Sequence, residues 1–253
     1  MNISSYDVTN IKNFIRMIPF LITPSREIKY PEYWEHQTEE IQTFSVDKTT
    51  KEFKDIQDKF YTVGTIQELL RIQNKIVYKK YYDEKNWLKE LNEGKEVLEA
   101  MLYHGTRGTD PEIIYGDKEE SFNINYTSDR NYLGKGTYFA VNPTYSHNYS
   151  YSYKEQEKTG ILNYFGRQSN SYKRAMFYCS VLIGDSQKIH QVTQQSQDMK
   201  DTDYKNKDKK IRYESSTTFT AGSDVYAVYK NRRAYPSYLI KYWNIIDKIR
   251  YIK

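Results

Sequence analysis

The chain contains 253 residues, with 38 lysines and arginines against 33 aspartates and glutamates, and its formal net charge is +5. Aromatic residues make up 16% of the sequence, which excludes an intrinsically disordered chain because such chains are depleted in aromatics. The hydrophobic fraction of 38% is sufficient for a core at this length, and no apolar run approaches the roughly 20 residues of a membrane span.

The N-terminal residues do not match a signal peptide, because the apolar stretch 14–22 is interrupted by Arg16 and no small-residue cleavage site follows. The single cysteine, Cys179, has no partner for an internal disulfide. These features predict a soluble protein of the cytosol or the nucleus, without membrane attachment.

Basic and acidic residues are interspersed, as in residues 51–55, which is typical of a solvated surface and gives little support for nucleic-acid binding. The lysine-rich stretch 205–210 is interpreted in the same way, as a solvated loop. We expect no metal site, because the histidines show no ligand spacing and the lone cysteine adds no partner. The histidines are His36, His104, His147 and His190.

The N-terminal part of the chain predicts an extension followed by helices. Residues 1–30 carry a short helical pattern ended by prolines, and we interpret them as an arm or a packed extension. Apolar residues recur at helical spacing over 49–61, which predicts an amphipathic helix. Evenly spaced apolar positions follow over 66–72. Asn74 then stands where the N-cap of a second helix is expected, and that helix is expected to run to Gly94, a plausible C′ residue.

From residue 101 onward the pattern changes to short strands separated by turns. Two long polar stretches, 150–174 and 188–210, are predicted to be mobile surface loops. We therefore expect a single α+β domain with a helical N-terminal layer. The predicted strands are Met101–Tyr103, Thr137–Val141, Ala175–Ile183, Val225–Tyr229 and Tyr238–Tyr242.

The first segment of functional interest is Leu102-Tyr103-His104-Gly105-Thr106, in which a predicted strand ends in a histidine, a glycine and a hydroxyl. Glycine lets a ligand approach the backbone closely, so that its N–H and C=O can together bind a carboxamide. A structural turn is the alternative for this segment taken alone.

The second segment runs from Gly134 to Tyr149. Its Asn142-Pro143 pair predicts an N-cap and the first residue of a helix. On that helix Ser146 and Tyr149 are three residues apart and share a face. If Tyr138 on the preceding strand points the same way, two aromatic rings and one hydroxyl form a slot for a flat aromatic carboxamide. An aromatic core with a surface serine is the alternative, and His147 is expected to lie at the surface.

The third segment comprises Asp224-Val225-Tyr226-Ala227-Val228-Tyr229 and Ala234-Tyr235-Pro236-Ser237-Tyr238-Leu239-Ile240. By itself it predicts a hairpin of two strands.

In this order and spacing the three segments resemble the catalytic domain of the PARP superfamily, the diphtheria-toxin-like ADP-ribosyltransferases. The similarity is strongest to the macrodomain-associated, mono-ADP-ribosylating branch, through residues 71–74, 134–141 and 234–240. It covers about residues 31–253, beginning with Pro31-Glu32-Tyr33-Trp34, and leaves 1–30 as an N-terminal extension. The resemblance implies an α+β fold of mostly antiparallel split β-sheets with an N-terminal helical layer.

The resemblance also implies NAD⁺ as the co-substrate and a role for each matching position. Residues 125–133 would correspond to the loop over the donor, and residues 186–213 to the loop flanking the acceptor site. His104 would bind the adenosine ribose, Gly105 would pair with the nicotinamide amide, Thr106 would assist, Tyr138 and Tyr149 would stack on the nicotinamide ring, and Ser146 would donate to its carboxamide.

One position departs from the chain-forming members of the superfamily. Their catalytic glutamate falls, in this sequence, on Val225, and the neighbouring Asp224 points to the opposite face of a strand. Glu214 is not a strong substitute either. A glutamate would bind the ribose 2′-hydroxyl and activate the hydroxyl that extends a chain, help that is worth about 10²–10⁴-fold. Without it we expect transfer of single ADP-ribose units to protein acceptors, acidic side chains and the chain itself included.

A catalytically silent domain that binds NAD⁺ or ADP-ribose, or that scaffolds partners, is the alternative of a different class. Retention of the pocket residues His104, Tyr138, Ser146 and Tyr149 favours the active enzyme over this alternative. Nucleic-acid binding has little residue-level support.

Overall fold

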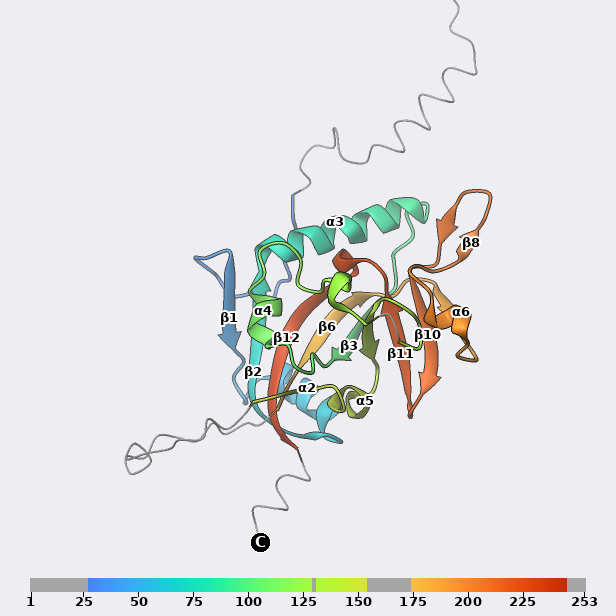
Figure 1. Cartoon of the computed structure of the whole chain (residues 1–253). Helices are drawn as coiled ribbons and strands as arrows, with labels where there is room; N and C mark the ends of the chain where they lie inside the picture. The colour runs from blue at the N-terminus through green and yellow to red at the C-terminus, as the bar shows by residue number, and fades with distance from the viewer. Residues whose placement is uncertain (1–26, 129–130, 154–173, 245–253) are drawn as a thin grey trace, which may run out of the picture. The chain divides into compact units, whose positions relative to one another are not determined.

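The computed structural model describes residues 27–128, 131–153 and 174–244 (Figure 1). The chain divides into two compact units, the first ending at Trp34 and the second beginning at Glu35. In the first unit the rings of Tyr30 and Trp34 stack with their centroids 5.1 Å apart, and the Trp34 N–H donates to the Pro31 carbonyl. The helical pattern expected within residues 1–30 lies outside the described residues.

The second unit is built on a large sheet (Figure 1). Within the described ranges ten strands join it in the order β1-β2-β12-β6-β3-β4-β11-β10-β7, with β5 attached to β6. Neighbouring strands are antiparallel except β7 and β10, which are parallel. The expected α+β class with a mostly antiparallel sheet is confirmed. The strands are β1 (Ile41–Ser45), β2 (Gly64–Asn74), β3 (Glu99–His104), β4 (Thr137–Ala140), β5 (Tyr151–Ser152), β6 (Arg174–Leu182), β7 (Ser186–Lys188), β10 (Ser215–Thr220), β11 (Ser223–Val228) and β12 (Ala234–Asn244).

The pairing in the sheet is shortest between β3 and β4, where one residue pair, Tyr103 with Ala140, joins the two strands. On one side of this junction lie β1, β2, β12 and β6, and on the other lie β11, β10 and β7. The expected splitting of the sheet therefore takes the form of two halves that meet at a single pair.

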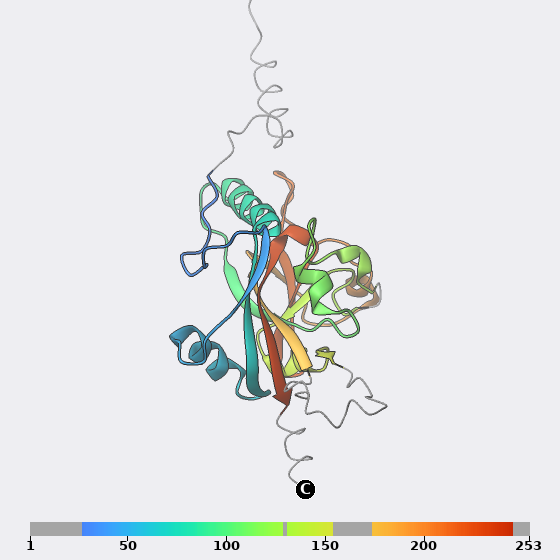
Figure 2. The same ribbon diagram turned by 90° about the vertical axis from the view of Figure 1, so that its left-hand side faces the viewer.

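Side chains that alternate along the central strands form two cores, one on each face of the sheet. In β6, Met176 and Tyr178 join the core that contains α2, whereas Phe177 and Cys179 join the core that contains Phe122. Figure 2 shows α2 and the segment around α4 on opposite sides of these strands. Cys179 is fully buried, and burial raises the pKa of its thiol.

The two predicted helices of the N-terminal part are confirmed as α2 (Lys51–Phe60) and α3 (Lys75–Leu91). The Thr50 side chain caps α2, and the Asn74 side chain caps α3 by accepting the N–H of Val77. The helix α3 stops at Leu91 with Asn92 as its C-cap, so Gly94 lies one residue beyond the C′ position expected for it. Gly94 has a φ of 87° in the turn beyond it. The shorter helices are α4 (Pro111–Tyr115), η1 (Ile124–Tyr126), α5 (Pro143–His147), α6 (Gln194–Gln197) and η3 (Asn231–Arg233).

Two of the sequence segments that carry the family resemblance bind each other. The Tyr235 hydroxyl accepts the Asn74 N–H (3.0 Å) and donates to the Ile72 carbonyl (2.9 Å). The Tyr238 hydroxyl donates to Glu52 of α2, which also accepts the Arg71 guanidinium. Segments 71–74 and 234–240 therefore hold β2, β12 and α2 together.

The hairpin expected for residues 224–240 is wrong. The strand β11 pairs with β4 and β10, whereas β12 pairs with β2 and β6 in the other half of the sheet. The stretch 188–210, expected to be a loop, contains α6 and one strand of a separate two-stranded sheet, β8 (Tyr204–Asn206) with β9 (Ile211–Arg212). Of the other expected loop, 150–174, only the ends lie within the described residues.

In the ranges that the structure covers, no helix combines the length and apolar character needed to cross a membrane.

Candidate active site

His104, the last residue of β3, joins the two halves of the sheet. Its Nδ1 lies 2.7 Å from the carbonyl oxygen of Tyr138 on β4. Because a carbonyl only accepts, Nδ1 carries the proton, and Nε2 of the neutral ring is left as an acceptor. The ring packs against Phe122 and Phe139, at 5.1 and 5.2 Å between centroids. Burial lowers the pKa of His104 despite this hydrogen bond, so the imidazole is neutral at pH 7.

Gly105 lies directly against the end of α5. A Cβ at this position would stand 2.4 Å from the backbone carbonyl of Tyr149 and 2.7 Å from that of Ser146, so only glycine fits. The contact continues at Arg107, whose N–H donates to the Tyr149 carbonyl (2.7 Å). The Thr106 hydroxyl closes the turn by bonding to the carbonyl three residues later. Within the described part of the chain, no hydrogen bond uses the N–H or C=O of Gly105.

The helix α5 begins as the sequence predicts. The side chain of Asn142 accepts an N–H of the first turn (2.9 Å), and Pro143 is the first helical residue. The expectation that His147 lies at the surface is wrong. Its Nδ1 lies 2.7 Å from the Tyr242 hydroxyl, and its Nε2 accepts from the Asn244 side chain. His147 therefore ties α5 to β12.

Ser146 and Tyr149 meet different partners at the end of α5. The Ser146 hydroxyl is buried and donates to the carbonyl of Tyr103, at 2.9 Å. The ring of Tyr149 lies 5.4 Å from the ring of Tyr145 and 4.5 Å below the guanidinium carbon of Arg107. Arg107 was not singled out from the sequence, because nothing local indicates that its side chain stacks on a ring 42 residues away.

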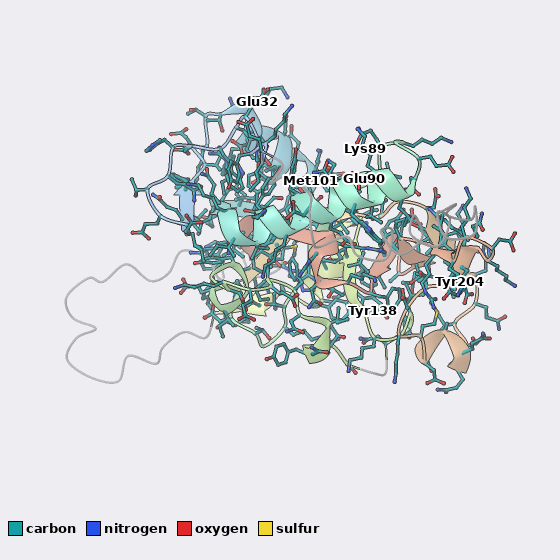
Figure 3. All side chains as sticks on the ribbon, turned by 90° about the horizontal axis from the view of Figure 1, so that it is seen from above. Glu32, Lys89, Glu90, Met101, Tyr138 and Tyr204 are labelled. Carbon is teal, nitrogen blue, oxygen red and sulfur yellow. The ribbon has the colours of Figure 1, made fainter. Side chains whose placement is uncertain are left out.

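Tyr138, labelled in Figure 3, binds the turn that precedes its own strand. Its hydroxyl accepts the Leu133 N–H and donates to the Gly134 carbonyl, both at 2.8 Å. Tyr229 binds the same turn, because its hydroxyl donates to the Leu133 carbonyl and contacts the Ser216 hydroxyl at 2.6 Å. Burial raises the pKa of Tyr229 to about 12 and raises that of Tyr138. Both hydroxyls therefore stay protonated and hold this turn.

Val225 pairs with Ala140 on β4 and with Thr218 on β10. Only 1% of its surface is exposed, whereas Asp224 is exposed on the opposite face, as the alternation of strand residues requires. Directly opposite residues of an antiparallel pair share a face. Val225, Ala140 and Tyr138 therefore lie on the same face of the sheet.

The structure thus assembles the predicted site residues in two groups. Tyr138 and Val225 share a face, and His104 reaches Tyr138 through its backbone. Gly105, Ser146 and Tyr149 form the second group where β3 packs on α5. Among the described residues no ring contact joins Tyr138 and Tyr149. A nicotinamide ring stacked between these two tyrosines needs about 3.5–4 Å to each of their rings, so in a sandwich the two tyrosine rings are not in contact with each other.

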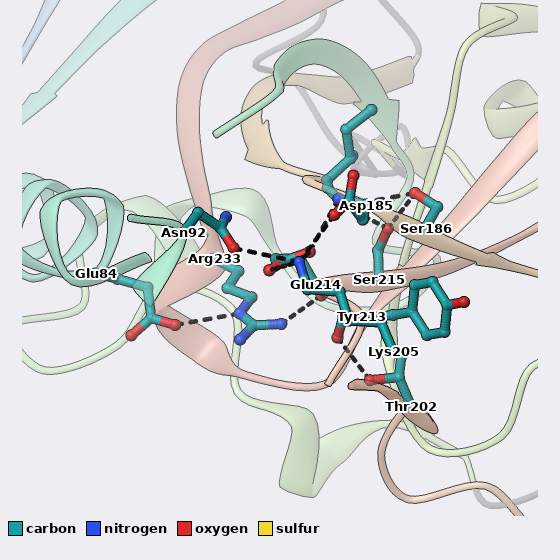
Figure 4. A network of polar contacts seen from close by, with 11 residues as sticks. Glu84, Asn92, Asp185, Ser186, Thr202, Lys205, Tyr213, Glu214, Ser215 and Arg233 are labelled. Atoms are coloured by element: carbon teal, nitrogen blue, oxygen red, sulfur yellow. Dashed lines mark hydrogen bonds and ion pairs between the residues drawn. The ribbon is translucent and has the colours of Figure 1, made fainter. Parts of the chain in front are cut away.

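A buried ion pair joins β8 to the start of β10 (Figure 4). The Glu214 side chain is 1% exposed, and the Lys205 ammonium lies 2.8 and 3.0 Å from its two oxygens. Lys205 also donates to Asp185 (2.9 Å) and to the side-chain oxygen of Asn92 (3.3 Å). Burial acts to lower the pKa of Lys205, but its hydrogen bonds to Glu214 and Asp185 outweigh burial, so that pKa is raised. The expectation that Lys205 belongs to a solvated loop is wrong.

Arg233 extends this network towards α3. Its guanidinium donates to the backbone carbonyl of Glu214 and to the carboxylate of Glu84 at 3.1 Å. The network joins α3, η3, β8 and the start of β10 (Figure 4). Sequence reasoning missed it because its members are spread from residue 84 to residue 233, with no spacing that relates them.

A cavity of about 730 Å³ lies within the segment 186–213, which the family resemblance led us to expect beside the acceptor site. It is lined by Ser186, Gln187, Lys188, Asp203, Tyr204, Lys207 and Tyr213. In the residues that the structure describes, no group of three or more histidine, cysteine or acidic side chains is arranged to hold a metal ion.

Comparison with known proteins places this sequence in a family. The chain is 30% identical to a probable poly(ADP-ribose) polymerase of Dictyostelium discoideum, over 84% of this chain and 57% of that protein. It is 27% identical to the protein mono-ADP-ribosyltransferase PARP11 of Mus musculus, over 93% of this chain and 73% of that protein. Identity to mouse PARP12, also named a protein mono-ADP-ribosyltransferase, is 28% over 70% of this chain.

The chain spans little more than half of the Dictyostelium relative and 21% of mouse PARP12. The family model of the poly(ADP-ribose) polymerase catalytic domain matches residues 43–244. That match covers both halves of the sheet and every predicted site residue. The chain therefore belongs to the poly(ADP-ribose) polymerase catalytic-domain family, in agreement with the resemblance seen in its sequence.

Proposed function

We propose that the chain is an NAD⁺-dependent mono-ADP-ribosyltransferase that transfers one ADP-ribose unit to acidic side chains of proteins, itself included, and releases nicotinamide. Two mammalian relatives, PARP11 and PARP12, are named protein mono-ADP-ribosyltransferases. The observation that carries the proposal is the buried valine, Val225, on the same face of the sheet as Tyr138.

The residues at the end of β3 fit the nicotinamide end of NAD⁺. The N–H and C=O of Gly105 have no hydrogen-bond partner among the described residues, and a carboxamide offers the complementary acceptor and donor. The Ser146 hydroxyl proton is committed to the Tyr103 carbonyl. Ser146 would therefore accept from the amide NH₂, and not donate to the carboxamide as expected from the family resemblance.

His104 fits a ribose hydroxyl. Its Nδ1–H is held by the Tyr138 carbonyl, so Nε2 of the neutral ring is an acceptor for a hydroxyl proton. The rings of Tyr138 and Tyr149 would stack on nicotinamide, and Tyr229 supports Tyr138 because both hydroxyls hold the same turn.

The transfer breaks the bond between nicotinamide and C1′ of its ribose, and the bonding electron pair leaves with the neutral nicotinamide. A carboxylate oxygen of the acceptor forms the new bond to C1′. The transition state is oxocarbenium-like, as in glycoside hydrolysis, so orientation and ring stacking contribute much of the catalysis. A carboxylate acceptor carries its own negative charge and needs no base.

Chain extension has a different requirement. The acceptor is then a ribose hydroxyl, which must lose a proton as it attacks. Val225 provides neither a base nor an acceptor for the 2′-hydroxyl, and the carboxylate of Asp224 lies on the opposite face. We therefore expect elongation to fail while transfer of the first unit proceeds.

The proposal is tested by substituting Tyr138 in two ways. Tyr138→Ala removes the stacking ring and should lower nicotinamide release and modification at least about tenfold. Tyr138→Phe keeps the ring and loses the bonds to Leu133 and Gly134, so it should retain more activity than Tyr138→Ala. Tyr61→Phe, at a tyrosine that is 68% exposed, is the control.

Circular dichroism establishes that each variant is folded before activity is compared. Full activity in a folded Tyr138→Ala variant would reject the proposed pocket. An unaltered chain that binds NAD⁺ and releases no nicotinamide would instead be a silent binding or scaffolding domain.

A further inference from the structure

The short helix α5 is attached to both halves of the sheet. At its start, the Asn142 N–H donates to the Ser223 hydroxyl of β11, at 3.0 Å. At its end, the side chain of His147 contacts β12, which belongs to the other half. In Figure 1, α5 lies beside the lower end of β12. A helix of five residues is too short to be stable alone, so these attachments set its orientation.

Both ring nitrogens of His147 are bonded to β12. The amide nitrogen of Asn244 can only donate, so Nε2 accepts from it and Nδ1 carries the proton of the neutral ring. The Nδ1–H therefore donates to the Tyr242 hydroxyl, at 2.7 Å. Tyr242 and Asn244 are alternate residues of the strand and lie on the same face of it. One imidazole thus binds two neighbouring side chains of that face.

The part of β12 that binds α5 is well packed. The ring of Tyr242 meets the ring of Phe60 in α2 edge-on, with 4.9 Å between centroids, and Tyr242 is fully buried. Asn244 is 7% exposed and pairs with Gly64 of β2. A Cβ on Gly64 would stand 2.0 Å from a backbone oxygen of β12, so the two strands are in close contact there. The end of β12 is therefore a firm anchor for α5.

His147 lies between two residues that are predicted to bind nicotinamide. Ser146 precedes it and donates to the Tyr103 carbonyl on β3, and Tyr149 follows two residues later. Successive residues of a helix point about 100° apart, so Ser146 can face β3 while His147 faces β12. Any rotation of α5 about its axis would stretch both contacts together. The bonds of His147 to β12 therefore restrict the same rotation that would move Ser146 away from Gly105.

Other attachments of this segment do not use the imidazole. The hydroxyls of Thr144 and Thr62 lie 3.3 Å apart, and Tyr151 of β5 pairs with Ala175 of β6 just beyond the helix. The Asn142 cap also remains when His147 is changed. A variant without the imidazole should therefore keep α5 and lose only its exact orientation.

We propose that His147 is a positioning residue for the nicotinamide end of NAD⁺: it fixes α5 on β12 so that Ser146 and Tyr149 keep their places beside β3. Both nitrogens of His147 are used by β12, so it acts through these two neighbours and not by binding the donor itself. The inference rests on the proposed function, because it concerns residues that are proposed to bind nicotinamide.

The test measures binding of two probes to the full chain by isothermal titration calorimetry. Benzamide has a flat ring and a carboxamide but no bond to ribose, whereas ADP-ribose lacks the nicotinamide ring. His147→Ala should weaken benzamide binding at least about fivefold, because the Ser146 hydroxyl and the Tyr149 ring are displaced. Binding of ADP-ribose should stay within about twofold, because its expected partner, His104, is held by β4. Equal weakening for both probes would overturn the proposal, since His147 would then support the fold as a whole.

Three further variants isolate the link to β12. His147→Asn keeps a side-chain donor for Tyr242 and should recover part of the affinity for benzamide. Tyr242→Phe removes one partner of the imidazole and should weaken benzamide binding, but it should add nothing to His147→Ala, because both changes break the same link. The control is Asn148→Ala, at the next residue, which is exposed and whose side chain forms no hydrogen bond within the described residues. The control should stay within about twofold of the unaltered chain, and independent losses in the double variant would contradict the link.

Nicotinamide release from NAD⁺ by the same preparations separates this inference from the proposed function. In His147→Ala the KM for NAD⁺ should rise by a larger factor than kcat falls, because the displaced residues bind nicotinamide before and during its release. No release by the unaltered chain would refute the proposed function, while the affinities for benzamide and ADP-ribose would still decide the role of His147. An unaltered chain that does not bind benzamide would overturn the inference. Circular dichroism establishes that each variant is folded, and His147→Asn and Tyr242→Phe carry the comparison if His147→Ala is not.

Discussion

His104 and Gly105 occupy adjacent positions at the end of β3 and are constrained in different ways. The imidazole bonds to β4, whereas the glycine is fixed by the space that α5 leaves for it. The sequence identified both residues, but not the packing of the glycine against α5. Its closest neighbour is the backbone of Tyr149, 44 residues away, and no local pattern predicts that approach.

Gly105→Ala tests this packing. The added Cβ would stand 2.4 Å from backbone atoms of Tyr149, so the variant should lose about 1–3 kcal/mol of unfolding free energy. Gly108→Ala, three residues later in the same loop, has no atom within 4 Å of the new Cβ and should change stability by less than about 0.5 kcal/mol. Urea unfolding of both variants measures the difference, and equal stabilities would contradict the packing described.

The lowered pKa of His104 predicts a pH-dependent stability. An unfolded chain protonates this histidine near its ordinary pKa of about 6.5, whereas desolvation of the partly buried ring lowers the pKa of His104 in the folded chain. As the pH falls below about 6.5, the unfolded state therefore gains a proton that the folded state lacks, and the free energy of unfolding falls.

The contribution of His104 is isolated with His104→Gln, which keeps a side-chain donor for the Tyr138 carbonyl and does not titrate. Urea unfolding at about pH 7.5 and about pH 5.5 should show a larger loss of stability for the unaltered chain than for His104→Gln. The same loss in both chains would mean that His104 is not held neutral.

At the scale of elements, a buried ion pair anchors the hairpin formed by β8 and β9. Lys205 neutralises Glu214, whose side chain is 1% exposed, while Lys209 of the same hairpin pairs with Glu93 at the surface. In both pairs the nitrogen and oxygen atoms lie 2.8 Å apart, so the two pairs differ in their burial and not in their distance.

Lys205→Met should cost about 3 kcal/mol of unfolding free energy, because it leaves the buried carboxylate of Glu214 without its cation. Lys209→Met should cost less than about 1 kcal/mol, because its pair is exposed and screened. Urea unfolding of the two variants compares the sites directly. If Lys205→Met were as stable as Lys209→Met, the network of Figure 4 would not anchor the hairpin.

Elements with local signals were predicted correctly, and elements fixed by distant partners were not. The caps Asn74 and Asn142 act within their own first turns, so the sequence contains the whole signal for them. The strands β11 and β12 are close in sequence yet belong to different halves of the sheet, a choice made by β4 and β2. Lys205 and His147 were assigned to the surface because Glu214 and Tyr242, their partners, cannot be paired with them from spacing alone.

At the scale of the whole second unit, the candidate site lies where the two halves of the sheet meet. One residue pair joins β3 to β4, and His104, Gly105 and Tyr138 surround that junction. The order of the motifs was enough to predict the family and the α+β fold from the sequence. The sequence did not predict that the site residues separate into two groups, or that a cavity lies at the edge of β7. Both features were found only in the three-dimensional structure.

We propose above that this domain transfers single ADP-ribose units. Mass spectrometry of the full chain and of an acidic acceptor peptide, after incubation with NAD⁺, tests it most directly. We expect glutamate or aspartate residues that each carry one ADP-ribose unit, together with released nicotinamide. Acceptors that carry a series of two, three and more linked units would contradict it, because Val225 offers no base for elongation.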